Sequence, residues 1–155
     1  MKNYTSGVPV ERTIMRIESA LVRAGASNIH KDYDDGHLEA ICFSIAHPEM
    51  KQKLSVRLPA DSKAVYDFMV SRVRKPHRGT MDRIREQASR TAWKIIQDWV
   101  EVQISLIEMR QAEFLQVFLP YIFDGKETFY NRLREGQFKL LTGAAVKTAD
   151  GGMKG

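Results

Sequence analysis

The stretch TMDRIREQASRTAWKIIQDWVEVQISLI, residues 80–107, has the pattern of one long helix with two different halves. In the first half, Met81, Ile84 and Ala88 form a narrow apolar stripe at helical spacing. Beyond Ala92, apolar side chains surround most of the helix. A helix that is apolar around most of its circumference is buried on more than one side. We therefore expect this helix either to run through the centre of the domain or to pack against a second copy.

The second half of this helix contains both tryptophans of the chain. Trp93 and Trp99 are six residues apart within the apolar run. They could stack on nucleobases, a contact worth ~1–3 kcal/mol per base, but packing in a core or a subunit interface suits their apolar surroundings better. We expect a homo-oligomer that associates through the long helix. The residues predicted for this contact are Trp93, Trp99, Val100 and Ile107.

Towards the N-terminus, an amphipathic helix is predicted at residues 9–24. Val10, Ile14, Ile17 and Leu21 recur at spacings of four, three and four, which places them on one helical face. Pro9 suits a first helical turn because its missing N–H has no partner there, and Gly25 is a natural end.

Between the two helices, three stretches alternate apolar and polar residues. They cover residues 29–33, 38–45 and 53–58, and an Asp35-Gly36 turn joins the first two. The pattern predicts a three-stranded antiparallel meander with one apolar face. The other face carries small and polar side chains, and we expect Arg57 and Lys31 to be available there to extend a basic track.

The whole order predicts an α+β fold: an N-terminal helix, a three-stranded antiparallel meander, then helices including one long C-terminal helix. A second helix follows a cap at Asp61 or Ser62, with Phe68 on its apolar face, and Thr80 is the expected N-cap of the long helix. A short helix is expected at about residues 127–134. Residues 1–141 would form a single domain, and residues 142–155 a flexible tail.

The bulk composition fits one globular domain. The chain has 155 residues, of which 43% are hydrophobic and 28% charged, and its single cysteine excludes an intrachain disulfide. Its first residues are polar, and no apolar run approaches the ~20 residues of a membrane span. We expect a cytoplasmic protein without a membrane partner and without a cofactor.

Positive charge is concentrated between residues 72 and 94. This window holds eight basic and two acidic residues, so its net charge is +6 against +5 for the whole chain. Such a cluster attracts phosphate backbones or acidic proteins. A merely solvated helix start is the more common reason for a cluster of this kind, and that alternative stays open.

The basic segment is the best candidate for a functional site. Arg83, Arg90 and Lys94 recur at spacings of seven and four and so share a helical face. The preceding helix end and loop add further cations, and the N–H groups at the helix start, around Thr80, attract anions. The predicted nucleic-acid-binding residues are Arg72, Arg74, Lys75, Arg78, Thr80, Arg83, Arg85, Arg90 and Lys94.

Other chemistry is weakly supported. Two histidines and three carboxylates lie at residues 30–37, but neighbours in a hairpin point to opposite faces, which argues against a metal site. Cys42 lies within a strand, where a packed position is more typical than a nucleophile. The sequence has no phosphate-binding loop, nucleophile elbow or dinucleotide fingerprint. We therefore expect a protein that is not an enzyme.

A family resemblance adds context. The chain resembles a group of proteins of about this size, with no established activity, from phage and prophage genomes. The resemblance covers about residues 8–141 and implies an accessory protein of a virus or mobile element, acting in the host cytoplasm. The segments that carry it are Val8–Thr13, Arg57–Pro59, Arg85–Ala88, Ala92–Lys94 and Asp98–Glu101.

The favoured hypothesis is a non-enzymatic phage-type accessory protein that binds nucleic acid, single-stranded DNA above all, through its basic segment. The alternative is a protein-interaction module, such as an inhibitor of a host defence complex (an anti-CRISPR protein or similar), whose basic segment meets an acidic surface. A weaker third hypothesis is a small-molecule or nucleotide site at the start of the long helix.

Overall fold

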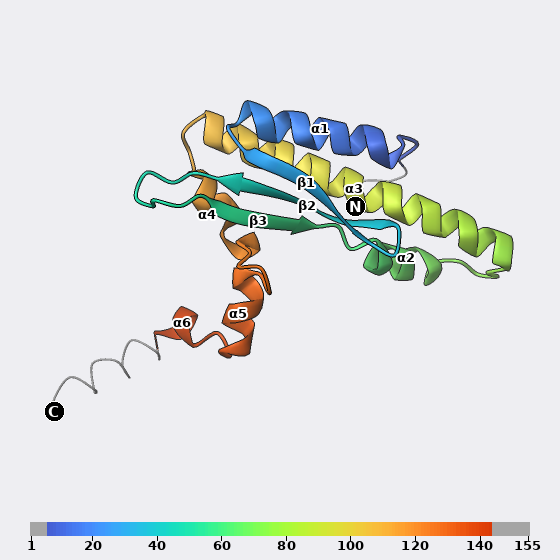
Figure 1. Ribbon diagram of the computed structural model, residues 1–155. Helices are drawn as coiled ribbons and strands as arrows, with labels where there is room; N and C mark the ends of the chain where they lie inside the picture. Colours follow the sequence, from blue (N-terminus) through green and yellow to red (C-terminus); the bar gives the residue numbers. More distant parts are fainter. Residues whose placement is uncertain (1–5, 144–155) are drawn as a thin grey trace.

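The computed structural model describes residues 6–143 and confirms the α+β class. A helix is followed by an antiparallel sheet of order β1-β2-β3 and then by the remaining helices (Figure 1). In chain order the elements are α1 (Val10–Arg23), β1 (Ser27–Asp34), β2 (His37–Ile45), β3 (Leu54–Pro59), α2 (Ser62–Val70), α3 (Arg78–Glu108), α4 (Phe114–Phe118), the 3₁₀ helix η1 (Leu119–Tyr121), α5 (Phe129–Glu135) and α6 (Lys139–Thr142).

The core lies between the sheet and the pair α1 and α3. Both helices lie behind the sheet, whose opposite face is turned to the viewer in Figure 1. Ile41 and Phe43 of β2 are buried in one cluster with Ile14, Ile17 and Leu21 of α1, because the alternation of the strand and the period of the helix bring their apolar sides together. The predicted meander and its apolar face are therefore confirmed.

The β1–β2 connection is the tight turn that Asp-Gly indicates. Asp35 and Gly36 have φ angles of 48° and 76°. Positive φ at both central residues defines the turn whose twist matches that of the flanking strands. It sets the pairing of β1 with β2, in which His30 lies opposite Cys42.

The long helix is covered largely by its own chain. It runs parallel to α1, since Gln87 Nε2 bonds the carbonyl of Ser6 near the start of α1 and Arg23 pairs with Glu108 where both helices end. On another side the first turns of α3 contact α2. Most of the apolar surface of α3 is therefore buried within the domain, while Ile95 and Val102 stay exposed.

This packing corrects two of the four residues predicted for a subunit interface. Trp93 and Val100 are fully buried in the core, so they have no surface to offer a second copy. Trp99 and Ile107 are half-buried and pack against the same core, and the Trp99 ring makes edge contacts with Phe118 and Tyr121.

Two helix boundaries in the structure also differ from those predicted. The long helix begins at Arg78, because the side chain of His77 accepts the N–H of Thr80 and serves as the N-cap in its place. The short helix expected at 127–134 is α5, with Thr128 as its cap. Of the expected flexible tail, residues 144–155 lie outside the described part of the chain, and Thr142 ends α6. None of the helices within residues 6–143 has the length and hydropathy to cross a membrane.

Candidate nucleic-acid interface

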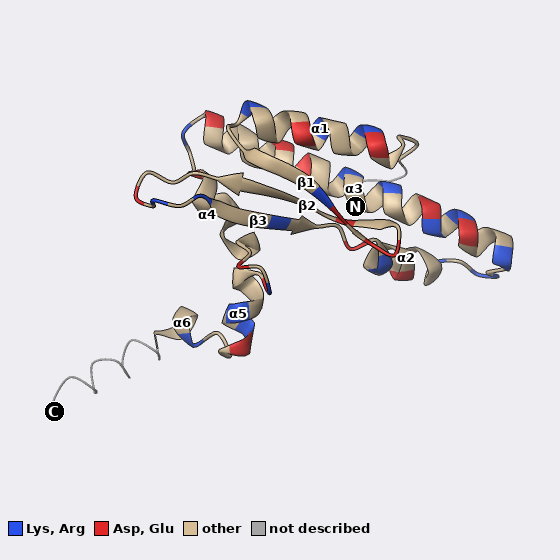
Figure 2. Cartoon of the chain, viewed as in Figure 1, with Lys and Arg blue, Asp and Glu red and all other residues tan. Residues whose placement is uncertain are grey.

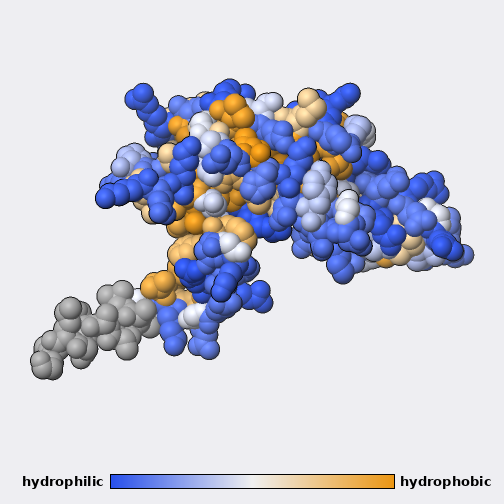
Figure 3. Space-filling model, viewed as in Figure 1, coloured by the Kyte–Doolittle hydropathy of each residue, from blue (hydrophilic) through white to orange (hydrophobic). Residues whose placement is uncertain are grey.

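The basic segment forms the tip of a helical hairpin made by α2 and the first turns of α3. Asp61 starts α2 by accepting the N–H of Ala64, and Val65 turns inward against the core cluster. Backbone hydrogen bonds continue the helical path to Val73, and α3 begins at Arg78. Figure 2 shows blue bands on the connection and on the adjoining end of α3, and Figure 3 shows hydrophilic residues covering this end of the molecule.

Five cations at this tip have no acidic partner. Arg72, Arg74, Lys75, Arg78 and Arg83 are exposed, and none of them forms an ion pair within residues 6–143. We call these five residues the basic tip. Their uncompensated charge creates a positive field that attracts polyanions.

Two arginines of the predicted site lie over aromatic rings of α2. The guanidinium of Arg72 is 4.8 Å from the ring centre of Phe68, and that of Arg85 is 5.4 Å from the ring centre of Tyr66. Arg85 also lies 3.6 Å from Asp82. Cation–π contact holds each guanidinium over a π-face, and aromatic rings and guanidinium groups are both surfaces on which an unpaired base stacks.

Thr80 does not present the free anion-binding group that the sequence predicted. Its N–H donates to His77 Nδ1 at 3.4 Å, and its hydroxyl lies 2.7 Å from His77 Nε2. Because a neutral imidazole has one donor and one acceptor, Nε2 carries the proton and donates it to the hydroxyl. Thr80 therefore serves the helix cap.

The last two cations of the predicted site are already engaged. Lys94 pairs with Asp98 at 2.9 Å, one turn further along α3. Arg90 is half-buried and donates to Gln87 Oε1 at 3.1 Å. Lys94 is therefore neutralised by Asp98. Arg90 has no acidic partner among the described residues, but it is half-buried, and its Nε is buried without a hydrogen-bond partner there.

The predicted residues surround the hairpin rather than form one stripe. Arg83, Arg90 and Lys94 share a side of α3, as their spacing indicates. Arg85 is two residues beyond Arg83, which places it about 160° around the helix axis, on the side where Tyr66 of α2 lies. A ligand that contacts both sides must therefore cross the tip.

The open face of the sheet does not extend the basic track. Arg57 donates twice to Asp32 Oδ2, at 3.1 and 3.2 Å, so its charge is neutralised across the strands. Lys31 pairs with Glu18 of α1, on the helical side of the sheet. The expectation that these two residues would be available on the outer face is wrong, because each has an acidic neighbour.

Cys42 lies in the middle of the same sheet face. Burial raises the pKa of its thiol, while Arg57 lowers it and Asp32 raises it by smaller amounts. A thiol whose pKa is raised stays protonated and is a poor nucleophile. Among residues 6–143 no three His, Cys, Asp or Glu side chains are placed to share a metal ion.

Sequence reasoning missed the aromatic part of the site. Phe68 was expected on the buried face of the second helix, but 42% of it is exposed. The spacing of four between Phe68 and Arg72 is a detectable signal, since such residues are neighbours on a helix. Tyr66 and Arg85 belong to different helices, so only the packing of α2 on α3 brings them together.

No match to the chain was found among protein-family models, curated proteins or solved structures. Its function is therefore argued from the chemistry of the site.

Proposed function

We propose that the protein binds nucleic acid without catalysing a reaction, and that its ligand is single-stranded DNA held at the α2–α3 hairpin. The observation that carries the proposal is the basic tip, where five exposed cations lie together without an acidic partner within the described residues. Phosphates supply the matching charge at regular spacing along a strand. This is the activity expected of a phage-type accessory protein that handles nucleic acid.

The preference for a single strand rests on the aromatic flanks of the tip. Phe68 and Tyr66 each carry an arginine over the ring, and Phe68 is open to solvent. Unpaired bases expose π-faces that stack on such surfaces, each worth ~1–3 kcal/mol. In a duplex the bases are stacked on one another, so only the phosphate contacts remain.

Fluorescence anisotropy with a labelled oligonucleotide tests the proposal. We expect binding to an unstructured single strand at ~50 mM salt, where phosphate contacts are strongest, and weaker binding to a duplex of the same length. Replacement of Arg74, Lys75 and Arg78 by glutamine should weaken binding by about tenfold or more.

A matched control separates the site from net charge. Arg12, Arg16 and Lys51 are exposed cations on α1 and on the β2–β3 connection. Their replacement by glutamine removes the same charge and should leave affinity within about twofold, because these residues lie outside the proposed contact. Equal losses in the two triple variants would contradict the site, and no binding at ~50 mM salt would overturn the function in favour of an acidic protein partner.

A further inference from the structure

The C-terminal helices α5 and α6 form an arm that hangs from the body below β3 (Figure 1). The root of the arm is firmly held. Phe123 N–H donates to the carbonyl of Ser55 in β3, and Phe129 N–H donates to the carbonyl of Ile122. We call residues 129–143 the arm.

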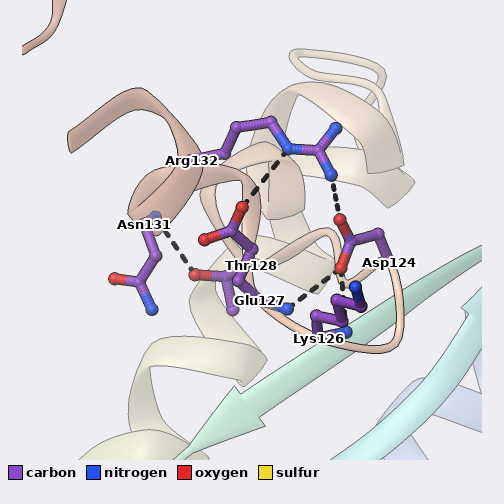
Figure 4. Close-up of polar contacts among 6 residues, drawn as sticks. All are labelled: Asp124, Lys126, Glu127, Thr128, Asn131 and Arg132. Carbon is purple, nitrogen blue, oxygen red and sulfur yellow. Dashed lines mark hydrogen bonds and ion pairs between the residues drawn. The ribbon is translucent and has the colours of Figure 1, made fainter. Parts of the chain in front are cut away.

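Side-chain contacts lock the turn that precedes the arm (Figure 4). The carboxylate of Asp124 accepts the N–H groups of Lys126 and Glu127, both at 2.9 Å. Arg132 of α5 pairs with Asp124 and with Glu127, and Thr128 caps the helix by accepting the N–H of Asn131. The arm therefore leaves the body in a defined direction.

The end of the arm presents apolar side chains to solvent. Leu140 is 62% and Leu141 is 69% exposed, and Tyr130 of α5 is also exposed beside the ring of Phe138. The free energy falls when another surface covers adjacent leucines at the end of a projecting segment. This group of exposed apolar side chains is a candidate interaction site.

A second uncovered apolar surface lies on α3. A shallow hollow of about 660 Å³ is lined by Ile95, Trp99 and Val102 among its apolar residues, and 57% of Val102 is exposed. The three residues follow one another at spacings of four and three, so they lie on one side of α3.

The charges of the two surfaces are complementary. The hollow includes Asp98 and Glu101 and no basic residue. Asp98 pairs with Lys94, whereas the carboxylate of Glu101 accepts the amide of Gln97 and forms no ion pair within residues 6–143. On the arm, Arg134 and Lys139 are exposed cations that form no ion pair within the described chain. The arm therefore combines apolar side chains with positive charge, and the hollow combines apolar side chains with negative charge, so the two surfaces are complementary.

We propose that the arm of one copy docks in the α3 hollow of a second copy, with Leu140 and Leu141 against Ile95 and Val102. The contact joins two different surfaces, so it is heterologous. If each copy docks its arm on the next copy, the contact yields a ring or a line of subunits. If two copies dock their arms on each other, it yields a closed dimer. The α2–α3 tip is outside both surfaces, so this association is independent of nucleic-acid binding.

Two surface variants test the docking. Leu140→Asp with Leu141→Asp removes the arm contact, and Ile95→Asp with Val102→Asp removes the hollow. All four residues are exposed, and circular dichroism verifies that both variants fold. Light scattering should show that the wild-type chain is larger than a monomer and that each double variant is a monomer. Val22→Asp, an exposed apolar position on α1, should keep the wild-type mass.

Mixing the two monomeric variants gives the decisive result. One retains an intact hollow and the other an intact arm, so the mixture should form a one-to-one complex of two chains and nothing larger. A monomeric wild-type chain, an arm variant that keeps its mass, or a mixture that stays monomeric would each overturn the proposal. The second of these results, an arm variant that keeps its mass, is the one expected if α3 paired with α3 of the second copy.

Charge exchange provides an independent readout. Glu101→Arg should weaken the wild-type association at least tenfold, and the same substitution combined with Arg134→Glu and Lys139→Glu should restore it. Failure of the combined variant to regain association would show that these charges do not meet, and would contradict the assigned contact.

Discussion

The guanidinium of Arg72 lies 4.8 Å from the ring centre of Phe68, one helical turn earlier on α2. This pair combines a cation with an exposed aromatic face at the edge of the basic tip. It is the feature of the site that separates recognition of unpaired bases from simple attraction to phosphate.

Phe68→Ala should weaken binding to a single strand by about five- to 150-fold, which corresponds to the loss of one stacked base at ~1–3 kcal/mol. Affinity for a duplex should change far less, because the cations remain. Anisotropy titrations with both oligonucleotides measure the difference. Tyr33→Ala removes a more exposed aromatic side chain from β1 and should change neither affinity. An equal loss for both oligonucleotides in the Phe68 variant would contradict a stacking role.

His77→Ala should destabilise the start of α3, because the N–H of Thr80 loses its side-chain acceptor. Loss of an N-cap costs about 0.5–2 kcal/mol of unfolding free energy. Asparagine also accepts this N–H, so His77→Asn should retain most of the stability. Urea unfolding compares the two variants, and identical midpoints for alanine and asparagine would show that the cap contributes nothing.

The thiol of Cys42 should react slowly in the folded protein, since burial raises its pKa and limits access. A raised folded pKa means that the protonated thiol is favoured by folding. Its stabilising contribution is present below the pKa of the unfolded thiol and is lost as pH rises through the folded pKa.

Two measurements check this assignment. A thiol reagent should modify the unfolded chain much faster than the native one, and unfolding free energy should fall at alkaline pH less steeply in Cys42→Ala than in the wild type. Rapid modification of the native thiol near neutral pH would contradict the protonated, buried state.

Asp124 should titrate below its ordinary range, because the backbone N–H groups of Glu127 and Lys126, and then the charge of Arg132, lower the pKa of its carboxyl group. A lowered folded pKa stabilises the root of the arm above the unfolded pKa, and this contribution is lost as pH falls through the folded pKa. Carbon NMR of the carboxyl group follows the titration directly.

Hydrogen exchange of α5 reports the consequence. Protection should fall on acidification in the wild type and change less in Asp124→Asn, which keeps an oxygen acceptor without its charge. Asp124→Ala should lower the hydrogen-exchange protection of α5 at every pH. A wild-type arm whose protection does not change on acidification would show that this carboxylate does not hold the turn.

Local signals predicted most of the fold. The spacing of Ile14, Ile17 and Leu21 specified the buried face of α1, and Asp35-Gly36 specified the hairpin, because each depends on periodicity or on backbone sterics alone. The apolar circumference of α3 had two explanations that sequence alone does not separate. Burial within one chain applies in part, because Trp93, Val100 and Ile104 are buried in the core cluster of one chain, whereas Ile95 and Val102 stay exposed.

The site was predicted only in part, because local sequence shows where charge is concentrated but not which charges meet in the fold. The charge excess depends on composition, so the segment was identified correctly as a basic surface. Which cations are free depends on their neighbours: Lys94 has Asp98 one turn away, and Arg57 meets Asp32 only through the strand register. The capping of α3 by His77 was missed because histidine is not among the residues most typical of that position.

The salt dependence of binding to a single strand tests the central claim most directly. If the five cations of the basic tip each contact a phosphate, a plot of log affinity against log salt should have a slope of about −3.5. Replacement of Arg74, Lys75 and Arg78 by glutamine should reduce the slope to about −1.4, because two contacts remain. A slope that is unchanged by these substitutions, or no binding at ~50 mM salt, would contradict nucleic-acid recognition by this tip.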